Sequence, residues 1–239
     1  MRLARFLAMS GIASRRASEV LITDGKVIVN GDKCTNVATN VEPGEDEVIY
    51  KGQILGIQKY VYIAMNKPVG YTCTASDPHE KKTIFSILPR KERLFSVGRL
   101  DKNSEGLLII TNDGDFANKL MHPKYELEKR YRVYVTGPIN SREINAVSRE
   151  GITYEEIEYR TTNIEIRKKT GNGGVLYFTL TEGKKREIRK ICTALGLTVR
   201  SLKRMQIGDL KLAELPVGTY RELKEKEIQS LIDLTKSDK

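Results

Sequence analysis

The stretch Val97-Gly98-Arg99-Leu100-Asp101-Lys102-Asn103-Ser104-Glu105-Gly106-Leu107-Leu108-Ile109-Ile110-Thr111 does most to decide the fold of this chain. Its two ends are apolar runs typical of buried strands, and two glycines bracket the polar segment between them. Polar loops held by a rigid sheet often carry reactive side chains. Asp101 lies in this loop with Arg99 and Lys102 nearby, and a carboxylate near cations stays ionised, as a nucleophile requires. Taken alone, the segment favours a simpler interpretation, an aspartate that caps a turn.

Working outward from this stretch, apolar runs and amphipathic segments predict the elements of a larger domain. Strands are predicted at Tyr60–Met65, Leu94–Val97, Leu107–Thr111, Tyr131–Val135, Thr161–Ile166, Val175–Leu180 and Leu197–Leu202. Helices are predicted at Asp115–Met121, Ser141–Ser148 (capped by Ser141 or Asn140), Lys185–Leu195 and Lys226–Leu234. This mixture of strands with inserted helices favours the α+β class over a parallel doubly wound sheet.

Residues 1–50 predict a small separate domain. Leu3, Phe6 and Leu7 have helical spacing, and Ser14 is a good N-cap for a second helix that should stop at Asp24-Gly25. A strand over residues 26–29, a hairpin turn at Asn30-Gly31 and a strand over residues 47–50 complete the unit. Residues 51–59 are predicted to be a linker, and residues 60–239 the second domain.

The charge of the chain favours an anionic partner, most often nucleic acid. The 239 residues contain 41 Lys and Arg against 31 Asp and Glu, a net charge of +10. The basic side chains concentrate in residues 1–33 and again in residues 184–204, which suggests two contact surfaces for one polyanion. An ordinary solvated face is the alternative interpretation. The candidate RNA contacts are Arg2, Arg5, Arg15, Arg16, Lys26, Arg99, Lys129, Lys184, Lys185, Arg186, Lys190 and Arg204. Arg186, Arg189 and Lys190 are predicted to share one helix face.

Several kinds of chemistry have no support in the sequence. There is no P-loop, no dinucleotide-binding glycine motif and no Gly-x-Ser-x-Gly. Only two histidines occur, His79 and His122, each beside a proline, so a histidine-based triad or metal site is poorly supported. The three cysteines are far apart, which argues against disulfides and zinc and favours the reducing cytoplasm. No apolar run approaches the roughly 18 residues of a membrane span. Chemistry must therefore rest on carboxylate, tyrosine, arginine or lysine side chains.

Four blocks of sequence resemble the pseudouridine synthases of the RsuA/RluB/RluF type. The blocks are Asn66–Gly70, the loop from Gly98 through Leu108 with Thr111–Asp115, Glu128–Val133, and Glu182–Lys190. They follow the order of the family and cover residues 60–220. Residues Arg2–Gly31 look like the alpha-L RNA-binding domain that the family carries in front. A single block is weak evidence, but four blocks in order behind the leading domain are specific.

This resemblance implies a site and a reaction. The nucleophilic aspartate of the family falls on Asp101, its tyrosine that packs on the target base falls on Tyr131, and its basic partner of the aspartate falls on Arg189. Read without the family, the last two are an ordinary strand tyrosine and a solvated helical arginine. The implied activity is isomerisation of uridine to pseudouridine in structured ribosomal RNA, where the target base must leave its stack. The implied catalytic domain is a long mixed, mainly antiparallel sheet with flanking helices. The isomerisation oxidises and phosphorylates nothing, so we expect no metal or small-molecule cofactor, and a monomer is the default expectation.

Alternatives to this interpretation stay open at the level of the sequence. Asp77-Pro78-His79 with Lys81-Lys82-Thr83, together with the block Glu182–Glu187, resembles large-subunit (23S) enzymes of the RluB type. Asn66–Gly70 and Asp101–Gly106 also suit the RluF type, and a small-subunit (16S) target of the RsuA type is compatible as well. A non-catalytic RNA-binding protein of ribosome assembly would share the leading domain and the charge. A metal-dependent nucleic-acid hydrolase could use Asp113 and Asp115, although N-capping of a helix explains both.

Overall fold

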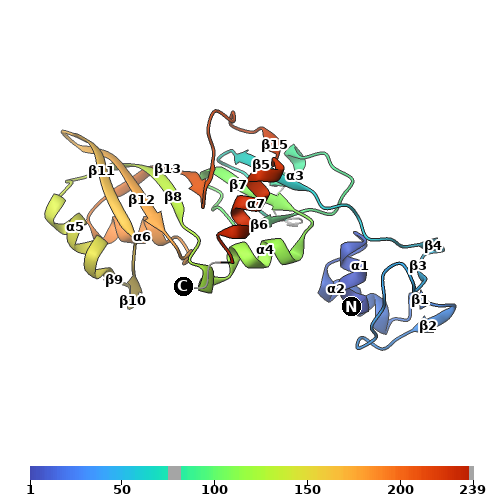
Figure 1. The fold of residues 1–239 in the computed structure, drawn as a ribbon. Helices are drawn as coiled ribbons and strands as arrows, with labels where there is room; N and C mark the ends of the chain where they lie inside the picture. Colours follow the sequence, from blue (N-terminus) through green and yellow to red (C-terminus); the bar gives the residue numbers. More distant parts are fainter. Residues whose placement is uncertain (75–81, 237–239) are drawn as a thin grey trace. The chain divides into compact units, whose positions relative to one another are not determined.

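A computed structural model of the chain describes residues 1–74 and 82–236, shown in Figure 1. The predicted target-specificity residues Asp77, Pro78, His79 and Lys81 lie outside this described part. The chain divides into two compact units. The first contains Met1–Val61 and Arg90–Phe95, and the second contains Tyr62–Pro89 and Ser96–Lys239.

The first unit has two helices and a four-stranded sheet, in the predicted order. The elements are α1 Leu3–Met9, α2 Arg15–Thr23, β1 Val27–Val29, β2 Asp32–Cys34, β3 Val48–Tyr50 and β4 Gln53–Ile54, with strand order β2-β1-β3-β4. The Ser14 Oγ accepts a hydrogen bond from the Ala17 amide at 3.2 Å, which confirms the predicted cap. Asn30 and Gly31 both have positive φ, as a tight turn between antiparallel β1 and β2 requires.

The predicted linker needs a correction, because part of it is structured. Ile54 of β4 pairs with Ile49 of β3, and the Leu55 amide donates to the Val48 carbonyl at 2.8 Å. Residues 51–59 therefore belong to the first unit, which continues to Val61. The strand signal was weak because β4 is only two residues long and both of them are exposed.

The second unit is built on a nine-stranded mixed sheet, as the family resemblance implied. Along the sheet the order is β11-β12-β8-β13-β7-β5-β15, with β14 beside β13 and β6 beside β7. Along the order from β11 to β15 the neighbouring strands run antiparallel, except that β13 and β7 run parallel, which joins the two halves of the sheet. The strands are β5 Tyr62–Lys67, β6 Phe95–Val97, β7 Glu105–Thr111, β8 Lys129–Thr136, β11 Asn163–Thr170, β12 Gly173–Leu180, β13 Thr198–Ile207, β14 Leu210–Lys211 and β15 Tyr220–Glu222.

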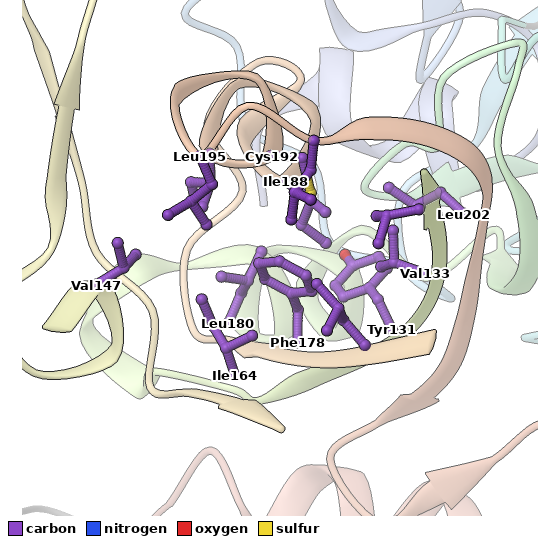
Figure 2. Packing of buried hydrophobic residues seen from close by; sticks show 14 of the residues in the cluster. Tyr131, Val133, Val147, Ile164, Phe178, Leu180, Ile188, Cys192, Leu195 and Leu202 are labelled. Carbon is purple, nitrogen blue, oxygen red and sulfur yellow. The ribbon is translucent and has the colours of Figure 1, made fainter. Parts of the chain in front are cut away.

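Helices flank this sheet, and one of them covers the main core. The helices are α3 Ile84–Ile87, α4 Gly114–Met121, η1 Pro123–Tyr125, α5 Ser141–Glu150, α6 Glu187–Ala194 and α7 Glu225–Asp233. Side chains alternate along β8, so Tyr131 and Val133 point to the same face. Figure 2 shows these two beside Phe178 and below Ile188 of α6. None of the described helices is long and apolar enough to cross a membrane.

Several features of this unit differ from the sequence prediction, among them the short elements α3, β14 and β15, which were not predicted. Helix α6 begins at Glu187 rather than Lys185, because Arg186 has a left-handed backbone with φ of 56°. Arg186 therefore does not share a helix face with Arg189 and Lys190. The strands β9 Ile152–Tyr154 and β10 Ile157–Tyr159 form a separate two-stranded hairpin that the sequence did not predict.

Candidate active site

Asp101 lies in the loop between β6 and β7, where a buried lysine holds the backbone in place. The Lys67 ammonium group donates to the carbonyl oxygens of Pro68 at 3.0 Å, Asp101 at 3.2 Å and Ser104 at 2.8 Å. Lys67 is fully buried, and burial lowers the pKa of its ammonium group. The Ser104 amide donates to the Asp101 carbonyl at 3.0 Å and closes a turn. The main chain of the loop is therefore fixed, while Asp101 itself is exposed.

Arg189 reaches the same loop from helix α6. Its Nη2 donates to the Asn103 carbonyl at 2.7 Å and contacts the Ser104 Oγ at 3.5 Å. Burial, and next the charge of Arg186, lower the pKa of the Arg189 guanidinium, whereas the negative charge of Asp101 opposes this shift. Within residues 1–74 and 82–236, the Asp101 carboxylate makes no hydrogen bond or ion pair. Arg189 thus acts on Asp101 by attraction through space and by anchoring the loop.

Tyr131 projects from β8 into the core beside this loop. It is 8% exposed and belongs to the same buried cluster as Leu100, the residue before Asp101. Figure 2 shows its ring among Val133, Leu202 and Ile188. The loop of Asp101 is therefore contacted by Arg189 of helix α6, and Tyr131 of strand β8 shares a buried cluster with its residue Leu100.

Not all of the predicted RNA contacts are exposed. In the first unit Arg2, Arg15, Arg16 and Lys26 are exposed and Arg5 is partly buried. Arg2 donates to the Ala38 carbonyl, and Lys26 forms an ion pair with Asp24 at 2.8 Å. In the second unit Arg99, Lys184, Lys185 and Arg186 are exposed, and Lys190 is partly buried.

The structure corrects the prediction for Arg204 and gives Lys129 a structural role. Arg204 is 3% exposed because it sits opposite Tyr131 on the buried face of β13, and its Nε donates to the Leu107 carbonyl at 2.7 Å. The Lys129 ammonium group donates to the Leu127 and Thr181 carbonyls at 2.9 and 3.0 Å. Burial, with the nearby Arg204 charge, lowers the pKa of Lys129 to about 8. Arg204 is therefore buried inside the fold, and the Lys129 ammonium group is bound to two backbone carbonyls.

Sequence reasoning missed two buried polar residues of this region. Lys67 follows an apolar run, and a lysine at the end of a buried strand was the available signal. Glu187 is 3% exposed, its carboxylate accepts from the Lys184 amide at 3.0 Å, and burial raises its pKa. The two acids considered for a metal-dependent hydrolase are explained by the cap of α4. The Asp113 Oδ1 accepts from the amides of Asp115 and Phe116, both at 3.0 Å.

Comparison with known proteins finds matches over nearly the whole chain, in both sequence and structure. A family model described as RNA pseudouridylate synthase matches residues 61–194, and one described as S4 domain matches residues 1–48. An uncharacterized RNA pseudouridine synthase of Aquifex aeolicus is 39% identical over 97% of this chain and 93% of its own. The ribosomal large subunit pseudouridine synthase B of Bacillus subtilis is 37% identical over 96% and 95% of the two chains. A crystal structure of a pseudouridylate synthase matches with a TM-score of 0.67 at 28% identity, over 97% and 99% of the chains.

Proposed function

Because this chain belongs to the family of RNA pseudouridine synthases that carry an S4 domain, we propose that it isomerises uridine in ribosomal RNA with Asp101 as nucleophile. The observation that carries the residue assignment is the loop of Asp101. Buried Lys67 and helix-borne Arg189 both donate to carbonyl oxygens of this loop, which holds its backbone in place while the Asp101 side chain stays exposed. Leu100, the residue before Asp101, shares a buried cluster with Tyr131. Rigid presentation of a reacting group is a large part of enzymatic rate enhancement.

The reaction needs only what these side chains offer. The bond between N1 of uracil and C1′ of ribose breaks, the uracil turns over, and C5 bonds to C1′. The hydrogen on C5 leaves to solvent, and N1 takes up a proton. Asp101 supplies the carboxylate for attack, Tyr131 supplies a flat apolar surface for the base, and Arg189 keeps the loop and the charge in place.

We propose a large-subunit (23S) target within ribosomal RNA. The support is the Bacillus subtilis relative, whose name assigns it to the large subunit and which aligns over nearly the whole chain. The alternative is a 16S target. We place the protein in the cytoplasm as a monomer that needs no cofactor, and its three free cysteines suit a reducing compartment.

The test of this proposal is the Asp101→Asn variant on rRNA labelled with tritium at C5 of uridine. The parent protein should release tritium from 23S transcripts and not from 16S transcripts. The variant keeps the size of the side chain but loses the nucleophile, so release should fall by at least about a thousandfold. Its affinity for the RNA, measured by filter binding, should stay within about twofold, because this carboxylate makes no hydrogen bond or ion pair in the described part of the fold.

A matched control is Asp209→Asn, which changes an exposed aspartate in the turn between β13 and β14. It should keep the parent rate. Tritium release by Asp101→Asn at the parent rate would refute the nucleophile assignment, and release from 16S alone would replace the proposed target. Binding without any release by the parent would leave a non-catalytic RNA-binding protein.

A further inference from the structure

The β9–β10 hairpin packs against helix α6, which carries Arg189. The hairpin is a separate antiparallel pair, with Ile157 opposite Tyr154 and Tyr159 opposite Ile152. Figure 1 shows it beside α6 and below the end of the sheet. Tyr159 is 1% exposed and lies in the same buried cluster as Ile188 and Ile191 of that helix. The position of α6 therefore depends partly on this hairpin.

Two lysines on either side of Arg189 are bound to the hairpin. The Lys184 ammonium group donates to the Glu158 carbonyl at 3.0 Å, and the Lys190 ammonium group pairs with the Glu155 carboxylate at 2.6 Å. Both ammonium groups lie about 6 Å from the centre of the Tyr159 ring, at 6.0 and 5.9 Å, within reach of a cation–π interaction. The hairpin thus holds the segment before α6 and also its first turn.

Residues 184–190, which the hairpin contacts at both ends, determine the position of Arg189. The Arg189 side chain spans from α6 to the Asp101 loop, where its Nη2 donates to the Asn103 carbonyl at 2.7 Å and lies 3.5 Å from the Ser104 Oγ, and a rotation of the helix would displace both contacts. The backbone just before the helix is irregular, because Arg186 is left-handed, so the helix start needs support from outside. The Glu187 carboxylate gives one such support through the Lys184 amide. The hairpin gives the other.

We propose that the β9–β10 hairpin positions Arg189, with Glu155, Lys184 and Lys190 as positioning residues. This inference rests on the proposed function, since it assigns a role toward the Asp101 loop. It also reassigns two predicted RNA contacts, because Lys184 and Lys190 use their charges within the protein. Lys185 and Arg186 are exposed, and their side chains make no hydrogen bond or ion pair among the described residues, so both are available to bind phosphates.

The sharpest variant is Glu155→Gln, with Glu156→Gln as its matched control. Both residues are exposed and adjacent in the hairpin turn, and both substitutions remove one negative charge. An exposed ion pair contributes little to global stability, so both variants should fold. The single-turnover rate at saturating enzyme should fall by about tenfold in Glu155→Gln and stay unchanged in Glu156→Gln. Equal rates in the two variants would overturn the proposal.

A second arm separates positioning from phosphate binding. A residue that contacts a phosphate lowers the slope of log affinity against log salt by about 1 when its charge is removed. Arg186→Gln should show this loss. Lys190→Gln should keep the parent slope and lose rate, and Lys190→Arg, which can still pair with Glu155, should recover most of the rate. A reduced slope with an unchanged rate in Lys190→Gln would make this lysine a phosphate contact instead.

A third arm does not depend on activity. Amide hydrogen exchange of residues 184–190, measured by mass spectrometry without RNA, should be faster in Glu155→Gln than in Glu156→Gln. If this difference appears but the parent forms no pseudouridine, the proposed function fails and the role of the hairpin in holding the segment stands. If the parent is active and neither rate nor exchange separates the two variants, the hairpin proposal fails alone.

Discussion

Lys129 gives the protein a dependence of stability on pH that can be assigned to one side chain. Its pKa is lowered from 10.5 to about 8, mainly by burial. Between these values the folded state loses a proton that the unfolded state keeps, so the free energy of unfolding rises with pH. The free-energy cost of burying the charged Lys129 ammonium group is fully present below pH 8 and is absent above pH 10.5. Partial exposure of the side chain screens it, so we expect a gain of about 2 kcal/mol over this window.

The measurement is urea unfolding at pH 7.5 and 9.5, with the transitions of the two units fitted separately. The parent should gain stability relative to Lys129→Met as the pH rises, because the variant has no group to titrate. Lys211→Met, which removes an exposed lysine, is the control and should follow the parent. A constant difference between the parent and Lys129→Met at both pH values would contradict the assignment.

For single residues, the sequence predicted the positions that lie in family motifs. It missed the residues whose burial depends on how the strands pair. Asp101, Tyr131 and Arg189 were each placed by a motif, and the structure brings them to one region, although their roles stay predictions. Arg204 looked like one more cation of a basic segment. Its burial follows from the alignment of β13 with β8, which puts it opposite Tyr131. The register between two strands that are distant in sequence cannot be deduced from the local sequence of either one.

Among the elements, the junction of β7 and β13 depends on a glycine. Gly106 has φ of 111°, and a Cβ there would lie 2.4 Å from the Arg204 carbonyl oxygen and 2.6 Å from its amide nitrogen. Both neighbours are backbone atoms, so Gly106→Ala must push apart the parallel pair that joins the two halves of the sheet.

We expect Gly106→Ala to lower the stability of the second unit by about 3 kcal/mol or more and to reduce the single-turnover rate, because the Asp101 loop leads directly into β7. Gly114→Ala is the matched control. A Cβ at Gly114 meets nothing within 4 Å, and the residue is the first of helix α4. Thermal unfolding should show it at or slightly above the parent. Equal stability of the two variants would contradict the close approach.

Elements whose caps and periodicity lie within their own sequence were predicted better than elements that are stabilised by packing against a distant segment. Of the two caps offered for α5, Asn140 is confirmed, because its Oδ1 accepts from the Arg142 amide at 3.0 Å. The β9–β10 hairpin was missed, since each strand has three residues and its apolar side chain Tyr159 is buried by α6, nearly thirty residues later. Three residues are too few for a period of two to be recognised.

At the scale of the whole molecule, composition and motif order predicted two units and an RNA partner, but not where the units end. The first unit takes in the predicted linker and also Arg90–Phe95, a segment that follows α3 in the sequence. The assignment of Arg90–Phe95 to the first unit depends on packing between residues that are distant in sequence, so no change of composition along the chain indicates it. The confirmed α+β class, by contrast, follows from the alternation of strand and helix patterns along the chain.

The two basic regions lead to a prediction about how the whole enzyme captures RNA. Arg15 and Arg16 are exposed at the start of α2 in the S4 unit, so the double variant Arg15→Gln/Arg16→Gln removes two charges without disturbing a core. If both bind phosphates, the slope of log affinity against log salt should fall by about 2, and the dissociation constant for 23S fragments should rise. The single-turnover rate at saturating enzyme should not change, because Asp101, Tyr131 and Arg189 all belong to the second unit. The matched control is Lys119→Gln/Lys211→Gln, which removes two exposed charges from the second unit and should keep the slope. A slope that falls equally in both double variants would mean that net charge, not the S4 surface, controls capture.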